Sequence, residues 1–163
     1  MEKNRIPVLR LENCQIIFKN FSGVETQFNR SGDRNFCVIF DDPQLVAELI
    51  EDGWNVRELK KRDEDDEQKF YLEVKVSYKA IPPKIFTVCR GVKTLLTEET
   101  VGELDYALIE NVDLAIRPYS WEVNGKTGIK AYCKTMYVTI EGDEFADKYG
   151  DDPLSDIVNE SPF

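Results

Sequence analysis

Basic and aromatic side chains alternate along three segments of this chain whose composition suits β-strands. They recur at every second position in 111–123, and the same spacing returns in 129–140 and in 69–79. Side chains two residues apart on a strand share a face, so cations there can follow the phosphates of a nucleic acid while rings stack on its unpaired bases. The pattern therefore indicates a platform for single-stranded nucleic acid, formed by Arg117, Tyr119, Trp121, Lys130, Tyr132, Lys134, Tyr71, Lys75 and Lys79.

A further group, Trp54, Arg57, Lys60 and Lys61, precedes an acidic run at 63–67. Two interpretations of this group stay open: it extends the platform, or its charges balance the acids that follow. An alternative also stands for the main pattern, in which the rings of 111–123 belong to the core and the lysines only keep the strands soluble.

Catalysis has little support in the sequence. The five consecutive acids at 63–67 are typical of a solvated turn, because carboxylates that share a metal are normally brought together from separated positions on rigid elements. The chain has no histidine for a hydrolase triad, and it has no glycine-rich phosphate loop. We therefore expect no catalytic residues, no metal site and no cofactor. A metal-dependent nuclease is the most distant alternative.

The elements that must position these residues are mostly strands. Asp42 as N-cap, Pro43 at the first helical position and Gly53 after the last turn predict one helix over 43–52, with Leu45, Val46, Leu49 and Ile50 on one face. Residues 97–108 are either a loop or a short helix. Extended segments are predicted at 8–18, 33–40, 54–62, 69–79, 85–90, 111–123 and 129–140.

The last third carries the clearest β pattern. Its two extended segments flank Asn124-Gly125-Lys126-Thr127-Gly128, a hairpin loop by composition. In the first arm Val112, Leu114 and Ile116 are predicted to face inward. In the second arm the apolar positions pass from odd to even numbers after Cys133, which predicts a bulge or a sharp coil in the middle of the strand.

Long bent strands, several hairpins and a capping helix predict an all-β fold, a small closed or partly open barrel. The chain has 163 residues and no repeat, which favours one domain with a tail. Four cysteines lie far apart without a CxxC pair, so we expect reduced, mostly buried thiols rather than a zinc site. No apolar run approaches the roughly 20 residues that span a bilayer, and the polar start is not a signal peptide.

The charge is concentrated toward the carboxyl end. Residues 141–163 carry eight acids and one lysine, a local charge of −7 out of a net −10. Without this segment and the run at 63–67, the rest of the chain has a charge of +2. Acids interleaved with Gly, Pro and Ser cannot bury enough apolar surface to offset their ordering entropy. We expect a flexible tail over 143–163 that ends in Pro162 and Phe163.

These features together resemble the single-stranded DNA-binding proteins of tailed phages and bacteria. The stretch IENVDLAIRPYSWEVNGKTGIKAYCKTMYVTIEG is similar to the closing hairpin of the phage-type members, and the terminal Pro-Phe matches the cellular ones. The resemblance implies an OB-fold-like five-stranded barrel with extra hairpins and one or two short helices, over 1–142. It also implies that the tail docks replication and repair proteins, through Asp151, Asp152, Asp156, Glu160, Pro162 and Phe163.

We therefore expect a non-enzymatic protein of the bacterial host cytoplasm that coats and protects single-stranded DNA during replication, recombination and repair. Its expected partners are single-stranded DNA, replication and recombination proteins bound through the tail, and a second copy in a homodimer, with no membrane. The alternative function is a regulatory module whose acidic segments mimic DNA and occupy the basic groove of another protein.

Overall fold

The described part of the chain forms one continuous sheet with a single α-helix. This computed structural model describes residues 6–27, 30–61, 63–65, 67–79 and 81–141. The predicted tail and its six partner-binding residues lie outside this part. In chain order the elements are β1 (Leu9–Asn20), β2 (Arg34–Phe40), α1 (Pro43–Asp52), β3 (Arg57–Leu59), β4 (Lys69–Val76), β5 (Lys84–Cys89), β6 (Val92–Leu96), the 3-10 helix η1 (Val101–Asp105), β7 (Ile109–Val123) and β8 (Lys126–Ile140).

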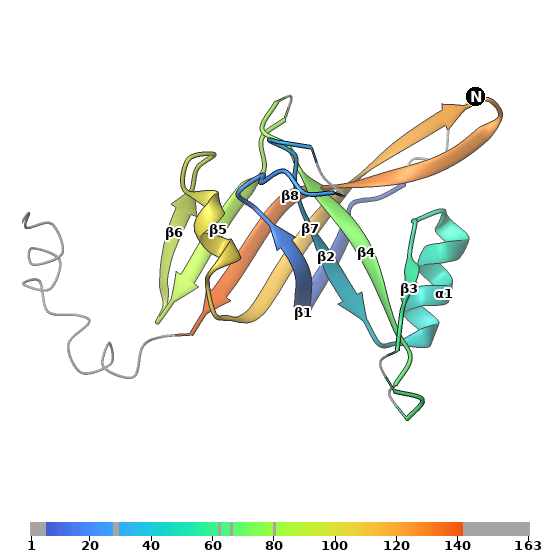
Figure 1. Cartoon of the computed structure of the whole chain (residues 1–163), viewed down its shortest axis with the longest axis horizontal. Helices are drawn as coiled ribbons and strands as arrows, with labels where there is room; N and C mark the ends of the chain where they lie inside the picture. The colour runs from blue at the N-terminus through green and yellow to red at the C-terminus, as the bar shows by residue number, and fades with distance from the viewer. Residues whose placement is uncertain (1–5, 28–29, 62, 66, 80, 142–163) are drawn as a thin grey trace, which may run out of the picture.

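Five of the strands close into a barrel. β1 pairs with β2 and β7, β2 pairs with β4, and β7 pairs with β8. A parallel pairing between β4 and β8 completes the circle, while β3, β5 and β6 extend the sheet beyond it (Figure 1). The expected all-β fold, an OB-like five-stranded barrel with additional strands, is confirmed.

The core fills the barrel with side chains from alternating positions. Val112, Leu114 and Ile116 are buried as predicted. On β4 the inward positions are Leu72, Val74 and Val76. The rings of Phe21 and Phe36 stack inside with their centroids 5.2 Å apart.

Two irregularities bend β1 around the barrel. Its register shifts between Leu11 and Cys14 against β7, and between Ile17 and Asn20 against β2. Asn13 and Phe18 lie within these shifts and have positive φ, 54° and 52°. Bulges of this kind raise the local twist, which allows one strand to pair with two neighbours of the barrel.

The helix begins and ends where its capping residues predict. The Asp42 carboxylate accepts a hydrogen bond of 3.0 Å from the amide of Gln44. Gly53 takes the left-handed conformation, φ 103°, that favours glycine at a helix end. Val46 and Leu49 are buried, but Ile50, predicted on the same face, is 52% exposed. No helix in the described ranges is long and apolar enough to cross a membrane.

Two connections between strands are two-residue turns, and the first of them is tighter than the sequence predicted. The β7–β8 turn consists of Asn124 and Gly125 alone, with φ 52° and 79°, so β8 begins at Lys126 rather than at 129. Arg90 and Gly91, with φ 49° and 82°, form a second such turn between β5 and β6. The β6 strand was not predicted, because its residues VKTLL carry no alternating pattern.

The structure shortens one predicted strand and settles one ambiguous segment. The expected strand at 54–62 shrinks to β3, and 97–108 contains η1. The Asp105 carboxylate holds η1 against the barrel, because it accepts hydrogen bonds from the amides of Phe21 and Ser22 at 2.7 and 3.0 Å.

Candidate nucleic-acid interface

The outer face of the β7–β8 hairpin alternates cations and rings across the strand pair as well as along it. In the antiparallel register Arg117 lies opposite Tyr132, and Tyr119 lies opposite Lys130. The two tyrosine rings meet edge to face at 6.2 Å between centroids. Tyr119 is 58% exposed, so its ring is not part of the core. The predicted gathering of these residues on one face is confirmed.

Trp121 packs against a glycine on this face. It lies opposite Gly128 in the register, and a Cβ atom at Gly128 would come within 2.6 Å of the indole ring. The indole ring therefore occupies the space that a side chain at position 128 would need. A glycine inside a strand often marks such a close approach. The sequence prediction missed this signal because it placed Gly128 in the loop rather than in the strand.

A bulge at Lys134 keeps the outer face of β8 polar along its length. Ile116 pairs with Cys133 and Ala115 with Thr135, so Lys134 has no partner on β7. Cys133 and Met136 are consequently both buried although they are three residues apart. The bulge predicted from the change of apolar parity is confirmed.

The pairing of β4 with β8 brings the third predicted segment to the hairpin. Lys75 lies beside Tyr132 in this pairing. Two concavities meet at Lys75 and Lys130: one of about 630 Å³ also contains Lys79 and Tyr132, and one of about 420 Å³ also contains Trp121. We call this surface the β4–β8 platform, defined by Lys75, Lys79, Arg117, Tyr119, Trp121, Lys130, Tyr132 and Lys134.

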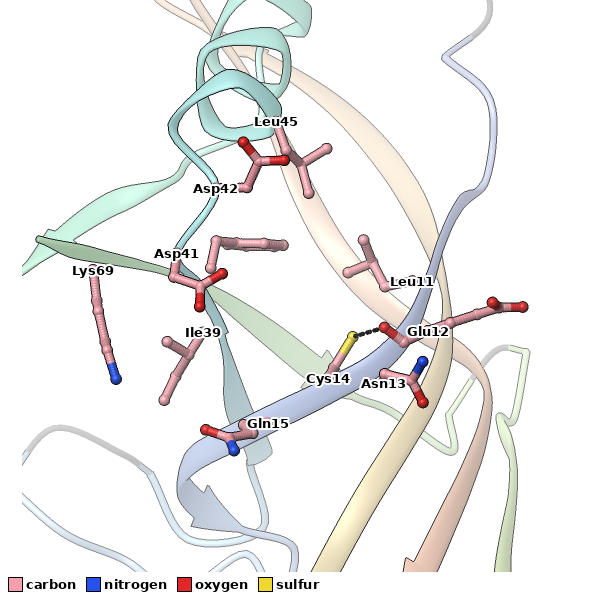
Figure 2. Close-up of a pocket in the computed structure, with 11 residues that line it drawn as sticks. Leu11, Glu12, Asn13, Cys14, Gln15, Ile39, Asp41, Asp42, Leu45 and Lys69 are labelled. Atoms are coloured by element: carbon pink, nitrogen blue, oxygen red, sulfur yellow. Dashed lines mark hydrogen bonds between the residues drawn. The ribbon is translucent and has the colours of Figure 1, made fainter. Parts of the chain in front are cut away.

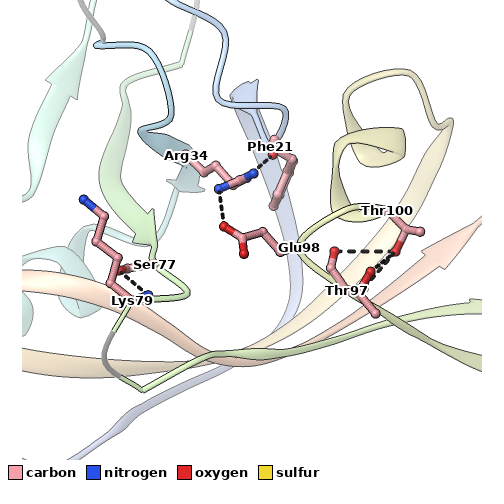
Figure 3. Close-up of polar contacts among 7 residues, drawn as sticks. All are labelled: Phe21, Arg34, Ser77, Lys79, Thr97, Glu98 and Thr100. Carbon is pink, nitrogen blue, oxygen red and sulfur yellow. Dashed lines mark hydrogen bonds and ion pairs between the residues drawn. The ribbon is translucent and has the colours of Figure 1, made fainter.

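The cations of the platform are available to a ligand. No described carboxylate lies within ion-pair distance of Lys75, Lys79 or Lys130. Arg34 lines the concavity that contains Lys79, but its guanidinium group is held by contacts within the fold. Its Nε donates to the Phe21 carbonyl at 3.0 Å and its Nη1 contacts a Glu98 carboxylate oxygen at 3.5 Å (Figure 3).

Beneath the platform the titratable groups stay protonated at neutral pH. Burial raises the pKa of the Cys133 thiol to about 12, although Arg117 partly opposes the shift. Burial likewise raises the pKa of Tyr78 to about 12, and its hydroxyl has no hydrogen-bond partner among the described residues. Thiolate is the reactive form of cysteine, so Cys133 is a packing residue here.

Tyr71 lies farther along β4, away from the hairpin. Its ring meets Phe18 edge to face at 6.3 Å, and both line a concavity of about 690 Å³ that also contains Glu73. Glu73 separates Tyr71 from Lys75 on the outer face of β4. Phe18 is 64% exposed and was missed by sequence reasoning, because nothing in its neighbours predicts the positive φ that turns it outward.

The group before the acidic run is divided by the structure. Trp54 was predicted to contact nucleic acid, but it is only 4% exposed and belongs to the core. Its amide donates a 3.0 Å hydrogen bond to the Leu49 carbonyl at the end of α1, and its backbone forms a bridge to Ile129 of β8. These contacts hold Trp54 between α1 and β8, where its ring packs in the core. Arg57 on β3 is exposed and is paired with Tyr71 of β4. Lys60 and Lys61 are exposed just beyond it, and none of these three lines the two platform concavities.

Another concavity is acidic, whereas the platform is basic. Glu12, Asp41 and Asp42 line a space of about 430 Å³ between β1, β2 and the start of α1, with Lys69 at its edge (Figure 2). The described residues contain no group of three or more ligating side chains placed to hold a metal ion. This acidic surface is unsuited to a phosphate backbone, in contrast with the platform.

Comparison with known proteins gives a family and two similar structures of one phage protein. A family model described as "Putative phage ssDNA-binding domain" matches residues 1–160. The single-stranded DNA-binding protein from bacteriophage Enc34 in complex with ssDNA is 11% identical, with a TM-score of 0.55 over 83% of this chain and 88% of that one. Its C-terminal truncation is 10% identical, with a TM-score of 0.53 over 82% and 86%. No curated protein matches. At these identities the structural likeness concerns the fold.

Proposed function

This chain belongs to the family of phage single-stranded DNA-binding domains, and from that premise we propose that it binds single-stranded DNA along the β4–β8 platform. One observation carries the assignment of the site: Lys75, Lys79 and Lys130, without described ion-pair partners, lie on the same surface as Tyr119, Trp121 and Tyr132. Cations beside stacking rings are what sequence-tolerant binding of a single strand requires.

In this proposal some residues contact phosphates and others stack on bases. Lys75, Lys79 and Lys130 neutralise phosphates, and Arg117 and Lys134 add charge along the hairpin. Tyr119 and Trp121 offer ring faces to bases, while Tyr132 supports Tyr119 at its edge. The protein acts by binding, coating and protecting the strand in replication and recombination, and no chemical step is assigned to it.

We further propose that the acidic segment 143–163 carries the contact to replication proteins, with Phe163 as the anchoring side chain. The segment is acidic and the platform is basic, so the two attract each other. A tethered segment has an effective concentration in the millimolar range, so weak pairing is enough to shield the platform until DNA displaces it. The domain division at 142 is part of this proposal.

Titration of the full chain with labelled dT oligomers tests the function. Binding without cleavage, tolerant of sequence, supports the proposal. Failure to bind single strands, together with capture of a DNA-binding protein, would instead favour the DNA-mimicking alternative. Magnesium-dependent cleavage of the oligomer would favour a nuclease.

A further inference from the structure

A second group of rings and a cation lies on the outer face of β8, on the other side of the bulge. Phe86 of β5 and Tyr137 of β8 are paired in the parallel register. Their rings stack at 5.0 Å between centroids and 10° between planes. The Nζ atom of Lys93 sits over both rings, 5.1 Å from the centroid of Phe86 and 5.7 Å from that of Tyr137.

We infer that Phe86, Lys93 and Tyr137, here called the β5–β6 patch, form a second contact site for the same single strand of DNA. This inference rests on the proposed function and extends it, because it continues the ligand path along β8 onto strands that lie outside the barrel.

The patch faces outward because of the bulge at Lys134. Residues 132 and 137 differ in parity, so on a regular strand they would point to opposite faces. The extra residue in β8 resets the alternation, and Met136 and Val138 are buried on either side of Tyr137. Phe86 likewise lies between the buried residues Ile85 and Thr87. Both rings remain partly exposed.

Exposed cations join the patch to the platform. Lys134 lies between Tyr132 and Tyr137, and Lys84 is paired with Thr135 beside it. Among the described residues, neither these two lysines nor Lys93 has an ion-pair partner. Tyr132 and Tyr137 are five residues apart, about 17 Å along a strand. OB folds bind roughly 4–16 nucleotides, so one strand can reach both groups.

The patch is also open at the side. Lys93 belongs to β6, which is the last strand of the described sheet and has no outer neighbour there (Figure 1). Lys93 also supplies a cation at this free edge, next to the partly exposed rings of Phe86 and Tyr137. A phosphate can pair with this ammonium group while a base contacts the exposed part of the rings.

Oligomer length separates this inference from the proposed function. The platform alone holds a short oligomer, whereas a long one engages both sites, with the second contact made intramolecular by the first. We would measure binding of the full chain to dT oligomers of about 6 and about 16 nucleotides. Phe86→Leu keeps an apolar cover but removes the flat ring, and Lys93→Gln removes the charge. Lys69→Gln, at the acidic concavity, is the matched control.

For the long oligomer we expect the Phe86→Leu variant to lose about fivefold to 150-fold in affinity, the range of one stacking contact. For Lys93→Gln we expect the salt slope to fall by about 0.7. The short oligomer should bind all variants as it binds the wild type, and thermal melts should show that each variant is folded.

Three results would overturn the inference. One is unchanged binding of the long oligomer by folded variants, and another is an equal loss for both lengths. The third is an effect that vanishes when residues 142–163 are deleted, because the patch would then bind the acidic segment rather than DNA. If the wild-type chain binds neither oligomer, the proposed function itself fails.

Discussion

Replacing Gly128 with alanine should weaken DNA binding without unfolding the protein. The added Cβ atom would lie 2.6 Å from the Trp121 ring, whereas carbon atoms pack at about 3.5–4.0 Å. The indole must therefore move by about 1 Å or more. Gly128 has no positive φ, so its backbone accepts alanine, and the strand gains up to about 1 kcal/mol from the loss of glycine freedom.

The expected loss of affinity follows from the position of the ring. A base stacked on an aromatic side chain contributes about 1–3 kcal/mol to the binding free energy. A displaced indole stacks less well, so part of this contribution is lost. Gly128→Ala should thus cost up to the same amount as Trp121→Ala, with little change in melting temperature. Fluorescence anisotropy with a dT oligomer, run beside thermal melts, measures both quantities.

A double-mutant cycle isolates the mechanism. If Gly128 acts only by seating Trp121, then adding Gly128→Ala to Trp121→Ala should cost nothing more, and the coupling energy should equal the effect of Gly128→Ala alone. Additive losses would show that Gly128 contributes in another way. If Gly128→Ala binds DNA with wild-type affinity while Trp121→Ala binds it weakly, then Gly128 does not position the Trp121 ring.

Three further outcomes are expected. Tyr119→Ala should cost about 1–3 kcal/mol of DNA affinity with an unchanged melting temperature, because the side chain is 58% exposed; a lower melting temperature would mean that the ring supports the fold. The pKa of Cys133 is raised from 9.0 to about 12, so the folded chain keeps a proton that the unfolded chain releases. Its contribution to stability is therefore complete below pH 9.0 and is lost as the pH rises toward 12. Urea unfolding at about pH 8 and about pH 10.5 should show this loss, and Cys133→Ala should reduce it; equal pH dependence in both proteins would contradict the assignment. Deleting 150–163 should raise DNA affinity at low salt and change the salt slope little, whereas equal affinity would end the shielding proposal.

Local patterns were enough to predict the parts of the fold that depend on neighbours in sequence. The capping residues located α1, and the change of apolar parity after Cys133 located the bulge. The same alternation placed Arg117, Tyr119 and Trp121 together on the hairpin. Each of these depends on the 3.6- or 2-residue period of an element, which the chain carries within a few positions.

The remaining parts depend on contacts between distant segments. The pairing of Lys75 with Tyr132 joins parallel strands far apart in sequence, and no local pattern specifies it. Trp54 follows a helix end and resembles an exposed aromatic in sequence, yet its position after Gly53 places it in the core. Phe86 and Tyr137 each belong to unremarkable strand sequence, and only the register brings their rings together.

The most direct test of the central claim is the salt dependence of dT oligomer binding by the full chain, compared with a Lys75→Gln, Lys130→Gln variant. If these lysines neutralise phosphates, log affinity should fall linearly with log salt concentration, with a slope of about −0.7 per contact. The variant should lose about two contacts' worth of that slope while remaining folded in thermal melts. An unchanged slope in the folded variant, or a flat response in the wild type, would contradict the assignment of the β4–β8 platform.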